Sequence, residues 1–152
     1  MGSDSSDEPS TYLNRQRKVR IDDGEIESFV RRLSRELARG REFGVVVGPD
    51  SAVREANQRF RNKAETTDVL SFPDGEDGRL GDILIAAGRA ERQARDFGHS
   101  VDQEVKTLIL HGLLHLLGFD HETDSGAMKV EEIRLRRRYG LEAGLIERAE
   151  SC

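Results

Sequence analysis

The chain has 152 residues, of which 36% are hydrophobic and 35% charged, and its formal net charge is −5. This length predicts one domain with a substantial core. Aliphatic side chains must fill that core, because tryptophan is absent and aromatic residues make up only 5% of the chain. The negative net charge excludes a protein that coats nucleic acid through its overall charge, but it leaves room for a local basic patch.

Features of secreted and membrane-spanning proteins are not found in the sequence. The first ten residues are polar and acidic, unlike the apolar segment of a secretory signal. The longest apolar stretch, residues 108–117, is too short to span a bilayer. Cys152 is the single cysteine and has no intramolecular partner, which suits a reducing compartment. We therefore expect a cytoplasmic protein with no membrane partner.

Hydrophobic periodicity predicts short strands among amphipathic helices, an α/β or α+β arrangement. The predicted strands cover about 19–21, 43–47, 66–73 and 80–86. The predicted helices cover about 23–40, 51–60, 88–97, 101–117 and 124–139.

The boundaries of this predicted domain follow from composition. We expect residues 1–15 to form a disordered N-terminal tail, 16–140 the folded domain, and 141–152 a C-terminal tail. Ser100 is a suitable N-cap for the fourth helix, with Gln103 in the capping-box position. The nearly continuous apolar residues of that helix predict that it is buried at the centre of the domain.

Three of the four histidines lie within eleven residues of this central helix and its end. His111 and His115 are four residues apart and project from one helix face. Gly118 can adopt the left-handed conformation that ends a helix, so the chain can bring His121 back against the other two. Three neutral imidazoles around an open fourth position are typical of a catalytic zinc site. Without a metal, each buried and unsatisfied imidazole would cost about 1–3 kcal/mol.

The spacing matches the metal-binding part of the metzincin signature, His-Glu-x-x-His-x-x-Gly-x-x-His, with one departure. Gly112 stands where those proteases carry the glutamate that acts as general base. Because glycine cannot transfer a proton, the sequence disfavours a peptidase of that mechanism. A metal at this site would still polarise a ligand and acidify water.

Several ordered blocks make the sequence similar to one known family. Residues 111–121 read HGLLHLLGFDH, which resembles the signature of the YbeY-type endoribonucleases, also called ribosomal-RNA maturation factors. The family's other strong block is similar to residues 57–63 followed by 67–73. Residues 80–83 and 98–100 also match its pattern and order, so the similarity covers roughly residues 19–139.

This resemblance implies a single compact α/β domain, with a small mixed sheet of about four strands, about five helices and a metal site on the central buried helix. It implies that His111, His115 and His121 bind one Zn²⁺ ion, although imidazole also suits nickel, copper and iron. It also implies that Arg61 contributes to catalysis or RNA contact. A bidentate pair between that arginine and a phosphate is within its chemistry.

The resemblance further implies a single-strand-specific, metal-dependent endoribonuclease. Such an enzyme acts in late maturation of small-subunit ribosomal RNA, including 3′ end processing, and in ribosome quality control. Its expected partners are single-stranded RNA and the small ribosomal subunit or its assembly factors. Two alternatives stay open: a metal-dependent hydrolase of another class, such as a peptidase or amidase, and a ribosome-associated binding module with a structural metal.

The general base is not identified by the residues. Asp120, Glu122 and Asp124 lie near the motif, but Asp120 can instead orient a histidine and the other two can begin the next helix. We expect a structural or cleft-wall role for His99, rather than metal binding, because it lies at the end of a predicted helix.

RNA contacts are predicted only in outline. Three groups of basic residues are candidate phosphate contacts: 59–63, 89–95 and 134–138. Aromatic residues placed to stack on bases are few: Phe60, Phe72 and Phe119.

Overall fold

Four strands form one mixed sheet in the order β1-β2-β4-β3 in the computed structural model, which describes residues 11–61, 67–74, 78–120 and 123–141. The strands are β1 (Thr11–Asn14), β2 (Glu42–Gly48), β3 (Val69–Pro73) and β4 (Arg79–Ala86). β2 runs parallel to both β1 and β4, whereas β3 is antiparallel to β4. β3 is therefore an edge strand in the described sheet.

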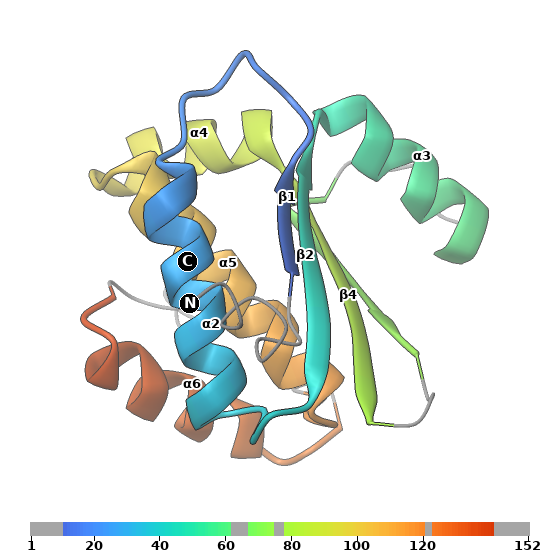
Figure 1. Ribbon diagram of the computed structural model, residues 1–152, viewed down its shortest axis with the longest axis vertical. Coiled ribbons are helices and arrows are strands. Elements are labelled where there is room, and N and C mark those ends of the chain that lie inside the picture. Colours follow the sequence, from blue (N-terminus) through green and yellow to red (C-terminus); the bar gives the residue numbers. More distant parts are fainter. Residues whose placement is uncertain (1–10, 62–66, 75–77, 121–122, 142–152) are drawn as a thin grey trace, which may run out of the picture.

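Five helices surround this sheet in the described part of the chain (Figure 1). They are α2 (Asp23–Glu36), α3 (Asp50–Arg61), α4 (Ala87–Phe97), α5 (Val101–Leu116) and α6 (Ala127–Arg138). α2, α5 and α6 lie on one side of the sheet and α3 lies on the other (Figure 1). The predicted α/β class, with about four strands and five helices, is confirmed. In the described part of the chain, every helix is too short or too polar to cross a membrane.

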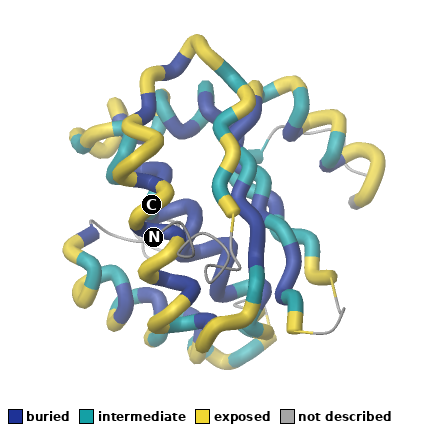
Figure 2. The backbone as a smooth tube through the Cα atoms, in the orientation of Figure 1, coloured by how far each residue is buried: buried dark blue, intermediate teal, exposed yellow. Residues whose placement is uncertain are grey.

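The main core lies between the sheet and the helices α2, α5 and α6 (Figure 2). α5 supplies most of its central residues, and nearly every position from 104 to 116 is buried. Ser100 caps this helix as predicted, because its side chain accepts a hydrogen bond from the backbone N–H of Gln103 at 3.1 Å. A smaller cluster of Val53, Leu70 and Ala86 joins α3 to the opposite face of the sheet.

The first strand differs from the prediction. Residues 11–14 form β1, which pairs with β2, so the expected disordered tail over 1–15 is wrong for this segment. Residues 1–10 lie outside the described part of the chain. The four residues of β1 show no strong alternation of polar and apolar side chains. The strand is defined by its parallel pairing with a distant strand, and a local sequence pattern does not reveal such a pairing.

The strand predicted at 19–21 is also wrong. Val19 and Ile21 are buried, but they belong to the connection between β1 and α2. The Gln16 side chain holds this connection, because it accepts from the Val19 N–H at 2.9 Å and donates to the Val19 carbonyl at 2.9 Å. Alternating burial therefore arises here from a loop whose side chains reach the core. At the other end, Leu141 is 5% exposed, so the core extends one residue past the predicted limit of 140.

Candidate metal centre

His111 and His115 lie on one face of α5, near its C-terminal end. Their ring centroids are 4.8 Å apart and the ring planes meet at 78°. The helix ends beyond them as predicted: the Gly118 N–H donates to the His115 carbonyl at 3.0 Å, and Gly118 has a φ of 105°. The four-residue spacing thus places two imidazoles side by side at the point where the chain turns away from the helix.

A hydrogen bond at Nδ1 orients each of these two imidazoles. His111 Nδ1 lies 2.7 Å from Oε2 of Glu132, a side chain of α6 that is only 1% exposed. His115 Nδ1 lies 3.1 Å from the carbonyl oxygen of Phe119. A carbonyl oxygen only accepts, and an ionised carboxylate does the same, so each ring carries its proton on Nδ1. In a neutral ring the lone pair then belongs to Nε2, which is the nitrogen that a metal ion would use.

Glu132 is a candidate site residue that the sequence analysis missed. It shares one face of α6 with the buried residues Met128 and Leu135, at helical spacings of four and seven. A carboxylate on an apolar helix stripe is the sequence signal that could have revealed it. The orienting role considered for Asp120 is filled at His111 by Glu132 and at His115 by a backbone carbonyl.

Gly112 lies at a close approach of α5 to the sheet. A Cβ atom at this position would lie 2.9 Å from Cγ2 of Ile83 and 3.1 Å from Oγ of Ser71. The Ser71 hydroxyl also donates to the Gly112 carbonyl at 3.0 Å, which ties β3 to α5 beside the histidines. The packing therefore leaves no space for the glutamate that a metzincin protease carries here. Glycine is required by the contact as well as being unable to act as a base.

A second cluster of candidate ligands lies at the other end of α5. Asp22, Glu25 and Asp102 offer carboxylate oxygens within 4.8 Å of one another. Asp22 caps α2 by accepting from the Glu25 N–H at 3.1 Å, and Asp102 accepts from the Asp22 N–H at 3.0 Å. Lys106 forms an ion pair with Glu25. These contacts explain the cluster as the junction between two helix N-termini.

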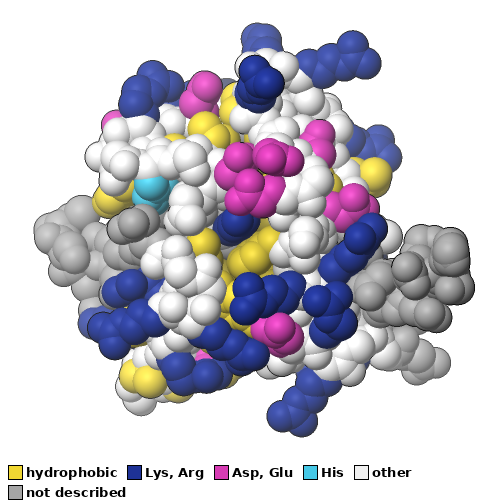
Figure 3. Space-filling model, turned by 60° about the vertical axis from the view of Figure 1, so that its left-hand side comes forward, with side chains coloured by type: hydrophobic (Ala, Val, Ile, Leu, Met, Phe, Trp, Pro, Cys, Tyr) yellow, Lys and Arg dark blue, Asp and Glu magenta, His cyan; other side chains and the backbone are white. Residues whose placement is uncertain are grey.

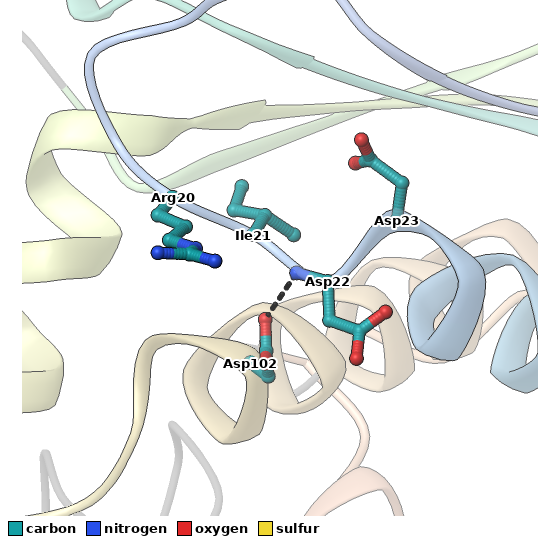
Figure 4. A pocket seen from close by; sticks show the side chains of 5 residues that line it. All are labelled: Arg20, Ile21, Asp22, Asp23 and Asp102. Atoms are coloured by element: carbon teal, nitrogen blue, oxygen red, sulfur yellow. Dashed lines mark hydrogen bonds between the residues drawn. The ribbon is translucent and has the colours of Figure 1, made fainter.

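A pocket of about 550 Å³ adjoins this junction (Figure 4). Its lining residues are Arg20, Ile21, Asp22, Asp23 and Asp102. Asp102 precedes His111 by nine residues on the same helix, so the pocket lies roughly 14 Å along α5 from the histidines. The pocket and the histidine pair are separate features.

Comparison with known proteins decides the family. The family model described as "Endoribonuclease YbeY" matches residues 11–139, most of the chain. The chain belongs to the endoribonuclease YbeY family. A relative named "Endoribonuclease YbeY" from Solibacter usitatus is 48% identical over 147 residues, which are 97% of this chain and 99% of the relative. Another with that name, from Koribacter versatilis, is 49% identical over 104 residues, covering 68% of each chain.

One similar solved structure supports the fold. The solution structure of a protein from Thermotoga maritima matches with a TM-score of 0.57 and 26% sequence identity. The match covers 82% of this chain and 85% of that one. The two chains therefore share their fold over most of their lengths.

Other predicted site residues of this YbeY-family chain are placed only in part. His121 and Glu122 lie outside the described residues. Arg61 is the last residue of α3, and its side chain also lies outside the described part. Asp124 accepts from the N–H groups of Gly126 and Met128 at 3.0 and 2.8 Å, so its carboxylate is engaged with the backbone at the start of α6.

Two of the predicted basic clusters are largely compensated by acidic partners. On α4, Arg89 pairs with Asp68 at 2.6 Å, and Arg92 pairs with Asp50 at 2.9 Å. On α6, Arg134 pairs with Glu131, and Arg138 pairs with Glu36 at 3.1 Å. Figure 3 shows Lys and Arg side chains gathered in the lower half of one face, with acidic groups among them. The four arginines on α4 and α6 are therefore paired with acidic groups of the protein, which lowers the net positive charge of both clusters.

Proposed function

We propose that this chain is a metal-dependent endoribonuclease that cleaves single-stranded RNA in late maturation of small-subunit ribosomal RNA, including 3′ end processing, and in ribosome quality control. The observation that carries the proposal is the oriented histidine pair in a chain of the endoribonuclease YbeY family. Both imidazoles have Nδ1 held, one by a buried carboxylate. Proteins use this arrangement to present Nε2 to a metal.

The donor chemistry of this site fits a transition-metal ion such as Zn²⁺. His111 and His115 would bind it together with His121, which follows the turn at Gly118. Three protein ligands leave one coordination position open, whereas structural zinc sites use four protein ligands. A Zn²⁺ ion there would supply Lewis-acid polarisation of a phosphate oxygen and would lower the pKa of water.

The chain's own residues have separate roles in this proposal. Glu132 and the Phe119 carbonyl keep the two imidazoles in the metal-binding tautomer and orientation. Arg61 would pair with a phosphate oxygen of the RNA through its planar guanidinium. The expected partners are single-stranded RNA and the small ribosomal subunit or its assembly factors, in the cytoplasm.

The alternatives are less well supported. A peptidase of the metzincin type would need a glutamate at position 112, where even a Cβ atom would clash with Ile83. A binding module with a purely structural metal would be expected to have a closed set of four protein ligands. The family to which the chain belongs is named for RNA cleavage.

A cleavage assay on single-stranded RNA tests the proposal. The purified protein should cut a single-stranded oligonucleotide, should leave the same sequence in a duplex intact, and should lose activity with a chelator. His115→Ala should lose the activity as well. The matched control is His99→Gln, because His99 is the remaining histidine and lies outside the motif.

Three results would count against the proposal. Undiminished cleavage by His115→Ala would point to a contaminating nuclease. Turnover of peptides without cleavage of RNA would support the hydrolase alternative. Tight binding to the small ribosomal subunit, with no cleavage and with unfolding on metal removal, would support the binding module.

A further inference from the structure

Phe60 is an unusually exposed aromatic side chain. It lies in the last turn of α3 and is 67% exposed. Its ring meets that of Phe72 on β3 in an edge-on contact, with centroids 5.6 Å apart and planes at 72°. Phe72 is itself anchored, because it packs against the small cluster between α3 and the sheet. Phe60 is thus held in position while most of its surface stays in contact with solvent.

A cation lies beside this aromatic pair. The guanidinium carbon of Arg59 is 5.5 Å from the centroid of the Phe60 ring, within the range of a cation–π contact. An exposed aromatic ring next to an arginine is the combination that proteins use to hold single-stranded nucleic acid. The ring stacks on a base and the cation attracts the backbone.

The pair is linked to the histidine site through β3, whose side chains alternate between the two faces of the sheet. Phe72 is the neighbour of Ser71, whose hydroxyl donates to the carbonyl of Gly112, and Gly112 follows His111. Ser71 therefore faces α5, whereas Phe72 faces α3 on the other side of the sheet. The rings and the imidazoles lie on opposite sides of the edge strand β3, on the order of 15–20 Å apart around that edge. A single RNA strand crossing the site can span that distance with a few nucleotides. Phe60 also directly precedes Arg61.

The surroundings favour a base over a protein partner. Large exposed hydrophobic residues in the described chain are few and scattered: Leu13, Phe60, Phe97 and Val130. A protein-docking patch requires several hundred Å² of contiguous apolar surface. An isolated ring flanked by the exposed polar residues Gln58 and Arg59 does not provide it, but it matches the face of one base.

We propose that Phe60, supported by Phe72 and Arg59, stacks on one unpaired base of the RNA strand held at the histidine site. This inference rests on the proposed endoribonuclease function and names a binding contact for it. Only an unpaired base that has left its own stack can present a face to the ring, so the contact favours single strands. Because all four bases have such a face, it gives little sequence preference.

The test uses the full-length, metal-loaded chain and a short single-stranded RNA containing 2-aminopurine, whose fluorescence falls when it stacks. The wild type should bind this RNA and quench the probe. Phe60→Leu keeps an apolar side chain without a π face, so its dissociation constant should rise roughly tenfold, with loss of quenching. Phe60→Tyr keeps an aromatic ring, so it should retain the wild-type dissociation constant and the quenching. For cleavage, KM should rise while kcat is kept, because the stack stabilises the ground and transition states equally.

Two controls separate stacking from other effects. An abasic RNA of the same length should bind the wild type and Phe60→Leu equally well. Phe97→Leu alters another exposed phenylalanine, which is 47% exposed at the end of α4, and should match the wild type on both RNAs.

The outcomes are distinguishable from those of the proposed function. If the wild type cuts RNA while Phe60→Leu keeps the wild-type dissociation constant and quenching, the stacking proposal is overturned and the nuclease assignment stands. Equal weakening on the abasic RNA, or self-association that Phe60→Leu abolishes, would also overturn it. A wild type that neither binds nor cuts RNA would refute the proposed function and this inference together.

Discussion

Two buried histidine–glutamate pairs occur in the described part of this chain, and they differ in which histidine nitrogen faces the glutamate. In one, His111 Nδ1 lies 2.7 Å from Glu132; in the other, His99 Nε2 lies 2.7 Å from Glu104. The four side chains are equally inaccessible, at 9% and 1% exposed in the first pair and 7% and 0% in the second. Burial and charge partner therefore do not distinguish a candidate metal ligand from a structural histidine.

The surroundings of the rings make the difference. The His111 ring, bonded through Nδ1, lies beside the His115 ring, with ring centroids 4.8 Å apart. His99 has its ring stacked on Phe97, and its Nδ1 is buried with no hydrogen-bond partner in the described structure. A metal site needs several convergent nitrogens, and only the first pair has a histidine neighbour among the described residues. The prediction of a structural role for His99 agrees with this geometry.

The largest expected effect is on catalysis. His111→Ala or His115→Ala should lower the rate of RNA cleavage by about 1,000-fold or more, because a lost metal removes several kcal/mol of transition-state stabilisation. His99→Gln should keep a rate close to that of the wild type in its folded fraction. Single-turnover cleavage of one RNA by all three variants measures this. If the cleavage rate fell as much in His99→Gln as in His115→Ala, the proposed difference between the two histidine–glutamate pairs would be wrong.

The two glutamates provide the next comparison. Glu132→Gln weakens the bond that orients His111, so metal affinity should fall about 10- to 100-fold. Glu104→Gln should leave metal affinity unchanged and instead lower the free energy of unfolding by about 1–3 kcal/mol. Competition with a chromophoric chelator and urea denaturation report the two quantities. Equal metal affinity in the two variants would contradict the proposed role of Glu132.

A smaller effect concerns Gly112, which lies in the sequence between the two histidines of α5. Gly112→Ala places a methyl group 2.9 Å from Ile83, and relief of that clash should cost about 1–3 kcal/mol of stability. The matched control is Gly24→Ala in α2, where the nearest atom lies 3.7 Å away. Alanine there should be neutral or stabilising by up to about 1 kcal/mol. Urea unfolding of the two variants gives both values, and a Gly112→Ala variant as stable as the wild type would refute the close approach of α5 to the sheet.

The smallest effect concerns how α6, which carries Glu132, is held against α2. Tyr139 donates to Glu36 at 2.8 Å, and burial followed by this hydrogen bond raises the pKa of Tyr139 to about 12. The folded state therefore holds the phenol proton more tightly than the unfolded state, whose pKa is near 10. The stabilisation is full below pH 10 and fades as the pH rises to about 12.

Tyr139→Phe should accordingly cost at most about 1 kcal/mol at neutral pH, since the contact is partly exposed. The stability of the wild type should fall toward that of the variant between pH 10 and 12. Denaturant unfolding over this pH range measures the difference. A gap that widened with rising pH would have the wrong sign for a raised pKa.

Local signals predicted the parts of this fold that local interactions form. The Ser100 cap, the end of α5 at Gly118 and the buried stripe of that helix each follow from residues a few positions apart, and the structure contains all three. β1 was missed because its pairing with β2 joins residues more than 30 positions apart. The alternating apolar residues Val19 and Ile21 suggested a strand, but they are buried side chains of a loop.

The candidate site shows the same limit. The histidine spacing indicated a metal site, but the partner of His111 comes from α6, 21 residues further along the chain. Hydrophobicity is also a poor guide on that helix, because the apolar Val130 is 66% exposed while the charged Glu132 is buried. From sequence alone, a glutamate is expected at the surface, and its burial can be predicted only when its partner is known. Close packing at Gly112 likewise depends on Ile83 and Ser71, which belong to other elements.

Metal content measured by mass spectrometry on the wild type and on alanine variants of all four histidines tests the central claim most directly. We predict about one equivalent of metal per chain in the wild type and in His99→Ala, and a small fraction of that in His111→Ala, His115→Ala and His121→Ala. Full metal content in His115→Ala, or its loss in a folded His99→Ala, would contradict the account.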